Sequence, residues 1–467
     1  MHKTRPYIYY DYTKSLCPEC LQTIDTKIVF RDQKVWMLKH CKEHGDSEVM
    51  IADDIDYYKQ IRNYNKQSEM PQKFNTKVHF GCPYDCGLCT DHEQHSCLSI
   101  VEITDRCNMK CPTCYANSGP NYGNHRTLEE INRMFDVIVE NEGEPDVVQI
   151  SGGEPTVHPQ IFEILDLAKS KPIKHLMLNT NGIRIAKDVD FVEKLASYMP
   201  DFEIYLQFDS FRKDVLMDLR GEDVTDVRKK AIENLNKFNL STTLVVVLQK
   251  GKNEDEIGEI LDFALKQKCV RGVTFQPTQV AGRNEDFDVA TQKITLTEVR
   301  RKILEQSPVF TAEDLIPVPC NPDALCMAYA LKMPTENGEE IVPMTRYISP
   351  EEILNNARST IVYEHDEQIK EHMLKLFSTG TSVDCAEDEF GDLMCCLPRV
   401  KGENLSYSNL FRIIIMNFMD CYDFDVRAVK KSCVHIVSNQ YKMIPFETMN
   451  LFYRDHKIDE IREQIKV

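Results

Sequence analysis

The chain has 467 residues, of which 42% are hydrophobic and 28% are charged, so it has the composition of a folded globular protein large enough for one catalytic domain and smaller modules. Its formal net charge of −18 argues against a nucleic-acid partner, because a protein that neutralises a phosphate backbone presents a basic surface. No apolar run approaches the roughly 18 residues of a membrane span. The first residues also lack the apolar core of a signal peptide, so we expect a cytoplasmic protein with at most peripheral membrane contact.

The chain contains 18 cysteines, and ten of them precede residue 115 in tight groups. The reducing cytoplasm disfavours disulfides, so clustered cysteines there indicate metal binding. We therefore expect several metal centres, most of them in the first quarter of the chain.

The first group has the spacing C-x2-C followed by C-x2-H, within a small module predicted over residues 1–60. Three thiols and an imidazole suit one tetrahedral metal ion, either zinc or a rubredoxin-like iron, and the ligand types do not separate the two. Buried thiols without metal are the alternative interpretation. The predicted ligands are Cys17, Cys20, Cys41 and His44.

Two further groups share the spacing C-x3-C-x2-C. The first lies in residues 61–97 and has a fourth cysteine close behind it, which predicts a fully ligated, electron-carrying [4Fe–4S] cluster. Its predicted ligands are Cys82, Cys86, Cys89 and Cys97. The second group, Cys107, Cys111 and Cys114, directly follows a predicted strand and has no fourth cysteine nearby. Three thiolates leave one iron of a [4Fe–4S] cluster open, and the amino and carboxylate groups of S-adenosylmethionine (SAM) can chelate that iron.

From residue 98 to about 285, apolar strands alternate with amphipathic helices. The predicted strands cover 98–104, 146–150, 175–179, 203–208, 243–248 and 272–276, and the predicted helices lie near 127–141, 159–170, 187–199, 224–238 and 254–267. Such alternation with short connections indicates a parallel sheet with right-handed crossovers. Six strands predict an α/β fold, namely an open, partial (β/α)6 barrel of the TIM type.

The alternation fades in residues 286–467, for which we predict a C-terminal α+β domain that binds a cluster and substrate and contains a hairpin around 433–446. Seven cysteines in this region, some in C-x5-C and CC groups, indicate another cluster. The alternative is that they are isolated buried thiols that pack as small apolar side chains. The predicted ligands are Cys320, Cys326, Cys396 and Cys433.

Several short motifs follow the second cysteine triplet, in order, at the ends of the predicted strands. They are ISGGEPT, LNTNG, YLQFDS and FQPTQVAGR, with DLRG after the fourth strand. Together with the loop CNMKCPTCY, they resemble the signature of the radical SAM superfamily over residues 98–285. Each motif alone has a plainer interpretation, such as a turn for GGE or a helix cap for Asp209.

The resemblance implies which residues bind SAM. Glu154 would meet its ammonium group, while Gly152 and Gly153 would let the backbone approach the ligand. Asp209 would bind the ribose hydroxyls, and Arg220 would pair with the SAM carboxylate. The full implied set is Tyr115, Gly152, Gly153, Glu154, Asn179, Gln207, Asp209 and Arg220.

The whole chain also resembles one subgroup of the superfamily. Its CPEC module, the four cysteines ahead of the radical SAM loop and the C-terminal SCVHIV…IPF segment are similar to the archaeal tetraether lipid synthase group, whose relatives include 7,8-dihydro-6-hydroxymethylpterin methyltransferases. The resemblance implies the radical SAM cluster, two auxiliary clusters and one mononuclear zinc or iron. From the cysteine groups of this chain we expect two to three [4Fe–4S] clusters. One departure is Ser432, where a second cysteine is expected.

The resemblance implies a 5′-deoxyadenosyl radical that removes hydrogen from an unactivated carbon. We predict carbon–carbon bond formation on lipid chains, with a ferredoxin- or flavodoxin-type protein as electron donor. The first alternative is a radical SAM C-methyltransferase that acts on a pterin or another small molecule. A maturase that modifies peptides and an iron–sulfur electron carrier without chemistry of its own are further alternatives, although an open cluster argues against the electron carrier.

Overall fold

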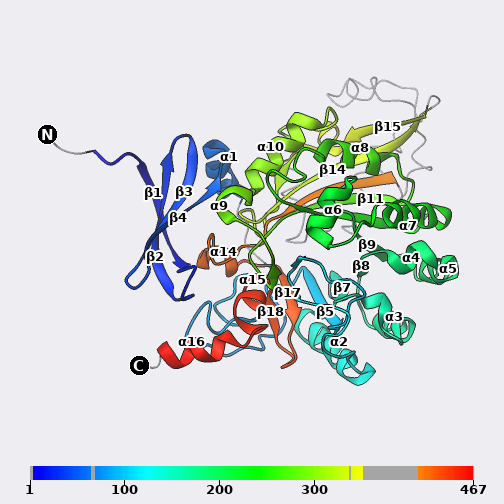
Figure 1. Ribbon diagram of the computed structural model, residues 1–467, viewed down its shortest axis with the longest axis horizontal. Helices are drawn as coiled ribbons and strands as arrows, with labels where there is room; N and C mark the ends of the chain where they lie inside the picture. The colour runs from blue at the N-terminus through cyan, green and yellow to red at the C-terminus, as the bar shows by residue number, and fades with distance from the viewer. Residues whose placement is uncertain (1–3, 65–68, 336–337, 351–408, 466–467) are drawn as a thin grey trace, which may run out of the picture.

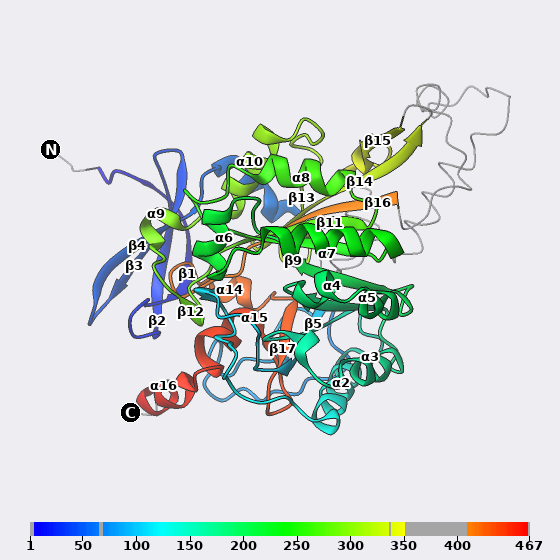
Figure 2. The same ribbon diagram turned by 45° about the vertical axis from the view of Figure 1, so that its right-hand side comes forward.

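The computed structural model describes residues 4–64, 69–335, 338–350 and 409–465. A small antiparallel sheet stands beside a large mixed sheet that curls into an open barrel with helices on its outer side (Figures 1 and 2). Cys385, Cys395 and the predicted cluster ligand Cys396 lie outside the described residues. Within the described ranges, no helix has the length and apolar character that crossing a membrane requires.

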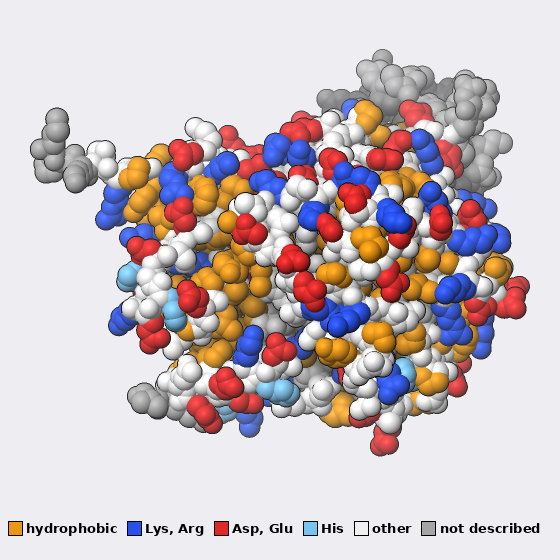
Figure 3. All heavy atoms as spheres, viewed as in Figure 1, with side chains coloured by type: hydrophobic (Ala, Val, Ile, Leu, Met, Phe, Trp, Pro, Cys, Tyr) orange, Lys and Arg blue, Asp and Glu red, His pale blue; other side chains and the backbone are white. Residues whose placement is uncertain are grey.

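The small sheet is a four-stranded antiparallel meander at the N-terminus. Its elements, with the helix that follows, are β1 (Ile8–Leu16), β2 (Thr23–Arg31), β3 (Lys34–Cys41), β4 (Gly45–Ala52) and α1 (Ile55–Gln60). Apolar side chains from alternating positions pack with Tyr58 of α1 into a separate core. Asp53 ties this sheet to the barrel, since its carboxylate lies 3.0 Å from Arg301 Nε. Hydrophobic side chains gather over these N-terminal strands and their junction with the barrel in Figure 3.

The six predicted strands form the parallel centre of the large sheet, which confirms the predicted fold class. They are β5 (Leu98–Thr104), β7 (Val147–Gly152), β8 (His175–Thr180), β9 (Phe202–Gln207), β10 (Thr242–Leu248) and β11 (Val270–Pro277). Each strand pairs in parallel with its neighbours in chain order. Their side chains are almost entirely buried, as expected for strands covered on both faces.

Helices connect these strands and cover the barrel. They are α2 (Leu128–Glu142), α3 (Ile161–Lys169), α4 (Ile183–Lys187), α5 (Val189–Ala196), α6 (Lys213–Arg220), α7 (Thr225–Phe238), α8 (Ile257–Lys266), α9 (Val289–Gln292) and α10 (Leu296–Gln306). Thr127 and Glu130 form a capping box that begins α2. The short helix α6, which ends at Arg220, was not predicted from the sequence.

The C-terminal segment extends the same sheet at both edges and does not form a separate sheet, so the predicted boundary at residue 285 does not divide the fold. Its elements are β13 (Ile316–Pro317), β14 (Leu325–Thr335), β15 (Gly338–Pro343), β16 (Leu410–Met416), β17 (Val434–Val437), β18 (Met443–Pro445), α14 (Val426–Val429), α15 (Phe446–Thr448) and α16 (Lys457–Ile465). β16 pairs in parallel with β11, and β17 pairs in parallel with β5. These strands satisfy backbone groups that would otherwise be unpaired at the edges of the parallel sheet. The antiparallel pair β17–β18 confirms the predicted hairpin.

A buried ion pair fixes β16 against the central strands of the barrel. Arg412 Nη2 on β16 lies 2.5 Å from Glu203 Oε2 on β9, and His175 Nε2 on β8 lies 3.1 Å from the same oxygen. Burial opposes ionisation of the carboxyl group, but the charge of Arg412 and the hydrogen bond with His175 hold the Glu203 pKa well below its usual range. The pair therefore links three strands through one charged contact.

Candidate active site

One cavity opens at the carboxyl ends of the barrel strands and runs into the barrel interior. Seven of the eight residues predicted to bind SAM line it, together with all three cysteines of the second triplet. These residues are Cys107, Cys111, Cys114, Tyr115, Gly152, Gly153, Glu154, Asn179, Gln207 and Arg220. At the opposite end the cavity reaches Leu98 and Val434, which begin strands β5 and β17. The cavity thus spans the length of the barrel.

The three cysteines lie on the loop that leaves β5 at Thr104. Burial raises the pKa of Cys107 to about 12, and the backbone N–H of Met109 donates a hydrogen bond of 3.4 Å to its sulfur. A thiolate in such a place is stabilised by a bound cation, so this thiol suits a metal ligand better than a free nucleophile.

Arg283, the last residue of the motif FQPTQVAGR at the end of the sixth strand, stabilises the cysteine loop through hydrogen bonds to its backbone. Arg283 donates from Nε to the carbonyl oxygen of Cys111 (2.5 Å) and from Nη2 to that of Ser118 (2.9 Å). A two-stranded sheet of β6 (Thr113–Cys114) and β12 (Arg283–Asn284) adds backbone pairing to these bonds. The loop is therefore held in shape by contacts that do not involve its sulfur atoms.

Gly152 and Gly153 are required by the cysteine loop itself. A Cβ atom on Gly152, where φ is +120°, would lie 2.2 Å from the carbonyl oxygen of Thr104, and one on Gly153 would lie 2.2 Å from that of Arg106. The Gly153 N–H donates to the Thr104 carbonyl oxygen at 2.8 Å. The backbone at both glycines therefore lies directly against the cysteine loop, which only a residue without a Cβ atom permits. Both glycines also line the cavity, as the sequence predicted.

Glu154 is almost completely buried at the side of the cavity. Its carboxylate accepts hydrogen bonds from the Thr156 and Thr180 hydroxyls, at 2.6 and 2.7 Å, and from the Asn181 N–H at 2.7 Å. Burial raises the Glu154 pKa, and these donors oppose that rise. A cation beside this carboxylate would favour its ionised form, which fits the predicted contact with an ammonium group.

Asp209 is not among the residues that line the cavity, so the predicted ribose contact stays a prediction, and the structure shows a different partner for this carboxylate. It is fully buried, and its two carboxylate oxygens accept from Arg220 Nε at 2.7 Å and Nη2 at 2.6 Å. Positive φ at Asp209 turns the chain after β9, so the side chain points back to α6. Asp209 thus holds Arg220, which also donates to Gln207 Oε1 at 3.0 Å, at the cavity wall.

Arg228 is a cavity residue that the sequence analysis missed. It lies on α7, is fully buried, and lines the cavity, and its Nε and Nη2 atoms have no hydrogen-bond partner among the described residues. Burial lowers its pKa to about 10. The signal in the sequence was a charged residue among the apolar positions of an amphipathic helix, with Val224, Ala231 and Ile232 on the same buried face.

The interior of the cavity combines amide groups with an aromatic wall. Asn179 donates to Ser151 Oγ at 3.0 Å and accepts from Gln207 Nε2 at 3.2 Å, which forms a polar chain across neighbouring strands. Gln149 and Gln276 add further amides to the lining. On the C-terminal side the rings of Phe418 and Phe446 stack with centroids 4.0 Å apart, and Tyr115 lies 5.0 Å from Phe446.

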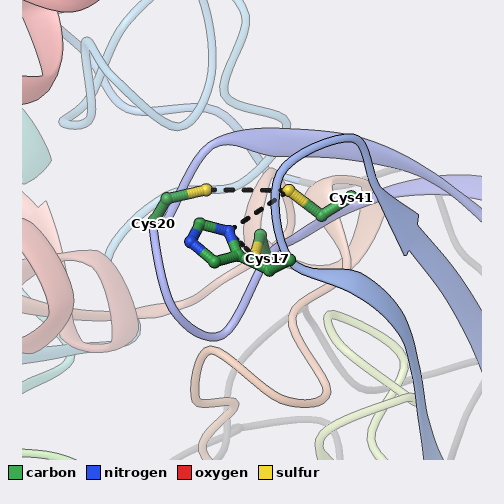
Figure 4. Close-up of side chains that lie close together, drawn as sticks. Cys17, Cys20 and Cys41 are labelled. Carbon is green, nitrogen blue, oxygen red and sulfur yellow. Dashed lines mark hydrogen bonds between the residues drawn. The ribbon is translucent and has the colours of Figure 1, made fainter.

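The N-terminal sheet brings its four predicted ligands together at one end. Cys20 and Cys41 are 4.0 Å apart at their sulfur atoms, and His44 Nδ1 lies 3.5 Å from Cys17 and 3.4 Å from Cys41 (Figure 4). All four ligand atoms lie within 4.8 Å of one another. These separations suit four ligands around one tetrahedral ion, with His44 bound through Nδ1.

A second compact group joins cysteines that the sequence analysis assigned to two different clusters. The sulfur atoms of Cys97, Cys320 and Cys433 lie within 4.8 Å of one another and are buried. Strand register explains the grouping: Cys97 precedes β5 and Cys433 precedes β17, and Leu98 N donates to the Cys433 carbonyl oxygen at 3.0 Å. The assignment of Cys97 to the Cys82 group is therefore corrected.

Two other predicted sets of cysteine ligands, Cys326 and the first triplet, lie outside this compact group. Cys326, predicted as a cluster ligand, lies on β14 in the barrel core beside Tyr57 and is outside this group. Cys86 lies beside Cys82, and burial raises the pKa of Cys89. Cys82, Cys86 and Cys89 are not among the groups of described residues whose ligand atoms all lie within 4.8 Å of one another, so their assignment to one cluster stays a prediction.

Two known protein families match parts of the chain. The family described as the Radical SAM superfamily matches residues 101–264, and the family described as the HMPTM N-terminal zinc ribbon domain matches residues 9–53. The barrel and its cysteine loop therefore define a radical SAM enzyme.

Similarity over the whole chain narrows the class further. The chain is 30% identical to the 7,8-dihydro-6-hydroxymethylpterin dimethyltransferase of Methanocaldococcus jannaschii over 97% of this chain and 95% of that protein, and it belongs to the family of that enzyme. It is 25% identical to mycofactocin maturase MftC of Mycolicibacterium smegmatis over 44% of this chain and 50% of that protein. The crystal structure of Streptococcus suis SuiB bound to S-adenosylmethionine aligns with a TM-score of 0.38 and 20% identity over 44% of this chain and 46% of that one.

Proposed function

We propose that this enzyme uses SAM and a [4Fe–4S] cluster to form a carbon–carbon bond on a planar nitrogen heterocycle of the pterin class. The observation that carries the proposal is the set of amide side chains inside the same cavity that holds the cysteine triplet. The amides come from four barrel strands: Gln149, Asn179, Gln207 and Gln276.

The residues at the mouth of the cavity fit the cluster and SAM. Cys107, Cys111 and Cys114 would bind three irons and leave the fourth for the amino and carboxylate groups of SAM. Arg228 Nε and Nη2 have no hydrogen-bond partner among the described residues, although Nη2 lies 3.8 Å from Asp209 Oδ2, so the SAM carboxylate would find two donors here. When bound, the cluster and SAM supply a 5′-deoxyadenosyl radical that abstracts hydrogen.

The protein's own contribution is orientation and charge. Glu154 would accept hydrogen bonds from the SAM ammonium group, while Arg220, held by Asp209, would face its carboxylate. Tyr115 packs against Phe446 and so joins the cysteine loop to the aromatic wall of the cavity. These contacts would orient SAM before any bond breaks.

The amides favour a heterocycle over a hydrocarbon. A pterin ring presents donors and acceptors along its edges, and amide side chains offer both. The stacked Phe418 and Phe446 rings provide an apolar face for a planar ring. A hydrocarbon chain in the same space could not use the donor and acceptor sites that remain on these amides beyond their bonds to Ser151, Tyr205 and Arg220. The amides among the cavity's apolar side chains therefore favour methylation of a pterin over the predicted coupling of lipid chains.

The remaining metal groups would serve as auxiliary centres. We assign one tetrahedral zinc or iron ion to Cys17, Cys20, Cys41 and His44. One iron–sulfur centre is assigned to Cys97, Cys320 and Cys433, whose sulfur atoms lie within 4.8 Å of one another. A second is assigned to Cys82, Cys86 and Cys89 from their C-x3-C-x2-C spacing. A small reduced electron-transfer protein would supply the electrons.

The test measures SAM cleavage and substrate separately. Anaerobically reconstituted protein with dithionite should release 5′-deoxyadenosine from SAM, and Cys107→Ala should abolish the release, while Cys269→Ala, which removes a buried core thiol outside the metal groups, should not. Equal cleavage by Cys107→Ala and the native protein would overturn the site.

Mass spectrometry of ligands extracted from the purified protein then decides the substrate class, since a pterin supports the proposal and a lipid overturns it. Gln276→Leu should weaken binding of 7,8-dihydro-6-hydroxymethylpterin about tenfold or more, because a lost amide contact costs about 1.4 kcal/mol or more. Gln464→Leu, on the exposed side of α16, is the matched control and should leave binding unchanged.

A further inference from the structure

A buried histidine lies between a carboxylate and one of the auxiliary sulfur atoms. His95 Nδ1 lies 3.0 Å from Glu142 Oε2, and its Nε2 lies 3.4 Å from Cys97 Sγ. The side chain of His95 is 9% exposed and that of Glu142 is 4% exposed. Neither the SAM site nor the substrate cavity uses this histidine.

The arrangement is built by two segments that end at the same point. Glu142 is the last residue of α2, and His95 lies two residues ahead of Cys97, just before β5 begins. The second oxygen of Glu142 accepts from the Ser96 N–H at 3.1 Å. One carboxylate therefore fixes both the imidazole ring and the backbone that leads to Cys97.

Both ring nitrogens of His95 face hydrogen-bond acceptors. A carboxylate can only accept, and a metal-bound cysteine sulfur is a thiolate that also accepts. A second carboxylate oxygen, from Glu69, lies 3.8 Å from Nε2. The ring is thus placed to donate at both nitrogens.

We propose that His95, oriented by Glu142, donates a hydrogen bond to the sulfur of Cys97 and sets the reduction potential of the centre at Cys97, Cys320 and Cys433. The inference rests on the iron–sulfur centre assigned to these cysteines above. Donors to cluster sulfurs stabilise the more electron-rich, reduced state, so they raise the potential of that centre. His95 is a positioning residue, because it acts on the iron through the cysteine sulfur.

The geometry favours a donor over a fourth ligand. Among the described residues, the ligand atoms that lie within 4.8 Å of one another are the three sulfurs, and His95 Nε2 does not join them. The neighbouring buried histidines do not take this role, since His435 Nδ1 lies 3.1 Å from Ser96 Oγ and its Nε2 lies 3.2 Å from His92 Nε2. In this cluster of imidazoles, His95 is the ring whose hydrogen-bonding nitrogen faces a sulfur atom.

The test is a reductive titration of the full reconstituted chain followed by electron paramagnetic resonance. His95→Leu should move the potential of one cluster to a more negative value and leave the others in place. His95→Gln, which can still donate, should move it less, and Glu142→Gln should give a shift of the same sign. His175→Gln alters another buried histidine hydrogen-bonded to a glutamate, here Glu203, and should leave every potential unchanged.

Three results would overturn the inference. Unchanged potentials in both His95 variants would show that the contact with Cys97 has no electronic effect. A strong nitrogen coupling in the pulsed spectrum of the native centre, lost in His95→Gln, would make His95 a ligand and not a donor. Iron content that is unaltered by Cys433→Ala would overturn the assigned centre itself, which separates that failure from failure of the role of His95.

Discussion

Replacing Asp209 by asparagine tests whether this residue holds Arg220 in place and does not bind ribose. The native pair is bidentate, with separations of 2.7 and 2.6 Å, and neither side chain is more than 10% exposed. The asparagine side chain would be nearly the same size, but its amide would place an N–H against the guanidinium group. Arg228 Nη2 also lies 3.8 Å from Asp209, so the variant would leave two buried cations without a nearby anion.

The expected magnitude follows from burial. Breaking a buried, hydrogen-bonded ion pair costs about 3–5 kcal/mol. Globular proteins gain about 2.1 cal/mol/K of unfolding entropy per residue, so for 467 residues each kcal/mol lowers Tm by about 1 °C. The variant should therefore unfold about 3–5 °C below the native protein in a thermal scan. SAM affinity should fall about tenfold or more if Arg220 loses its orientation, since tenfold corresponds to about 1.4 kcal/mol.

The matched control is Asp262→Asn. Asp262 pairs with Lys266 one helical turn away on α8, and both side chains are about 70% exposed, so its loss should change stability by less than about 0.5 kcal/mol. If Asp209→Asn behaves like this control in both the thermal scan and SAM titration, then Asp209 does not organise the cavity wall. If SAM affinity falls without any loss of stability, a direct contact between Asp209 and SAM becomes the better explanation.

Three further predictions test the loop, the sheet and the N-terminal metal group. Gly153→Ala should lower the iron content and SAM cleavage of the reconstituted enzyme, because the added Cβ would lie 2.2 Å from the Arg106 carbonyl oxygen and push the cysteine loop out of place; full iron loading would contradict this. Glu203→Gln should lower the free energy of unfolding by about 3–5 kcal/mol, since Arg412 loses its buried partner, and a denaturant titration within about 1 kcal/mol of native would refute it. Cys17→Ser should remove about one equivalent of zinc or iron by elemental analysis and lower the stability of the N-terminal sheet, and unchanged metal content would exclude Cys17 as a ligand.

Local pattern was sufficient for much of the barrel. The six parallel strands and the capping box at Thr127 follow from short apolar runs and from side-chain hydrogen bonds between residues three apart. The four predicted N-terminal ligands lie together as their spacing suggested, because the two tight pairs sit on the β1–β2 and β3–β4 turns at the same end of the meander. These features depend on neighbours in sequence, which is why the sequence alone could reveal them.

The C-terminal strands could not be placed in this way. Strands β16 and β17 look like ordinary apolar segments, and nothing in their residues says which edge of a sheet each will join. Backbone pairing with β11 and β5 decides it, since both edges would otherwise expose unpaired hydrogen-bonding groups. The same pairing brings Cys433 beside Cys97. Cys97 therefore lies with Cys433, whereas its spacing in the sequence predicted a group with Cys82, Cys86 and Cys89.

The sequence by itself determined the class of chemistry, because the cysteine triplet, the GGE motif and the following strand ends are local and in fixed order. The tertiary structure decided which polar groups line the cavity and which only support others. Asp209 was predicted to contact the ligand, but the chain turns after β9 and directs its carboxylate toward α6. Arg228 was not predicted as a site residue, yet α7 buries its guanidinium group against the cavity. Side-chain direction of this kind depends on how distant helices pack on the barrel, and so it is a property of the assembled fold.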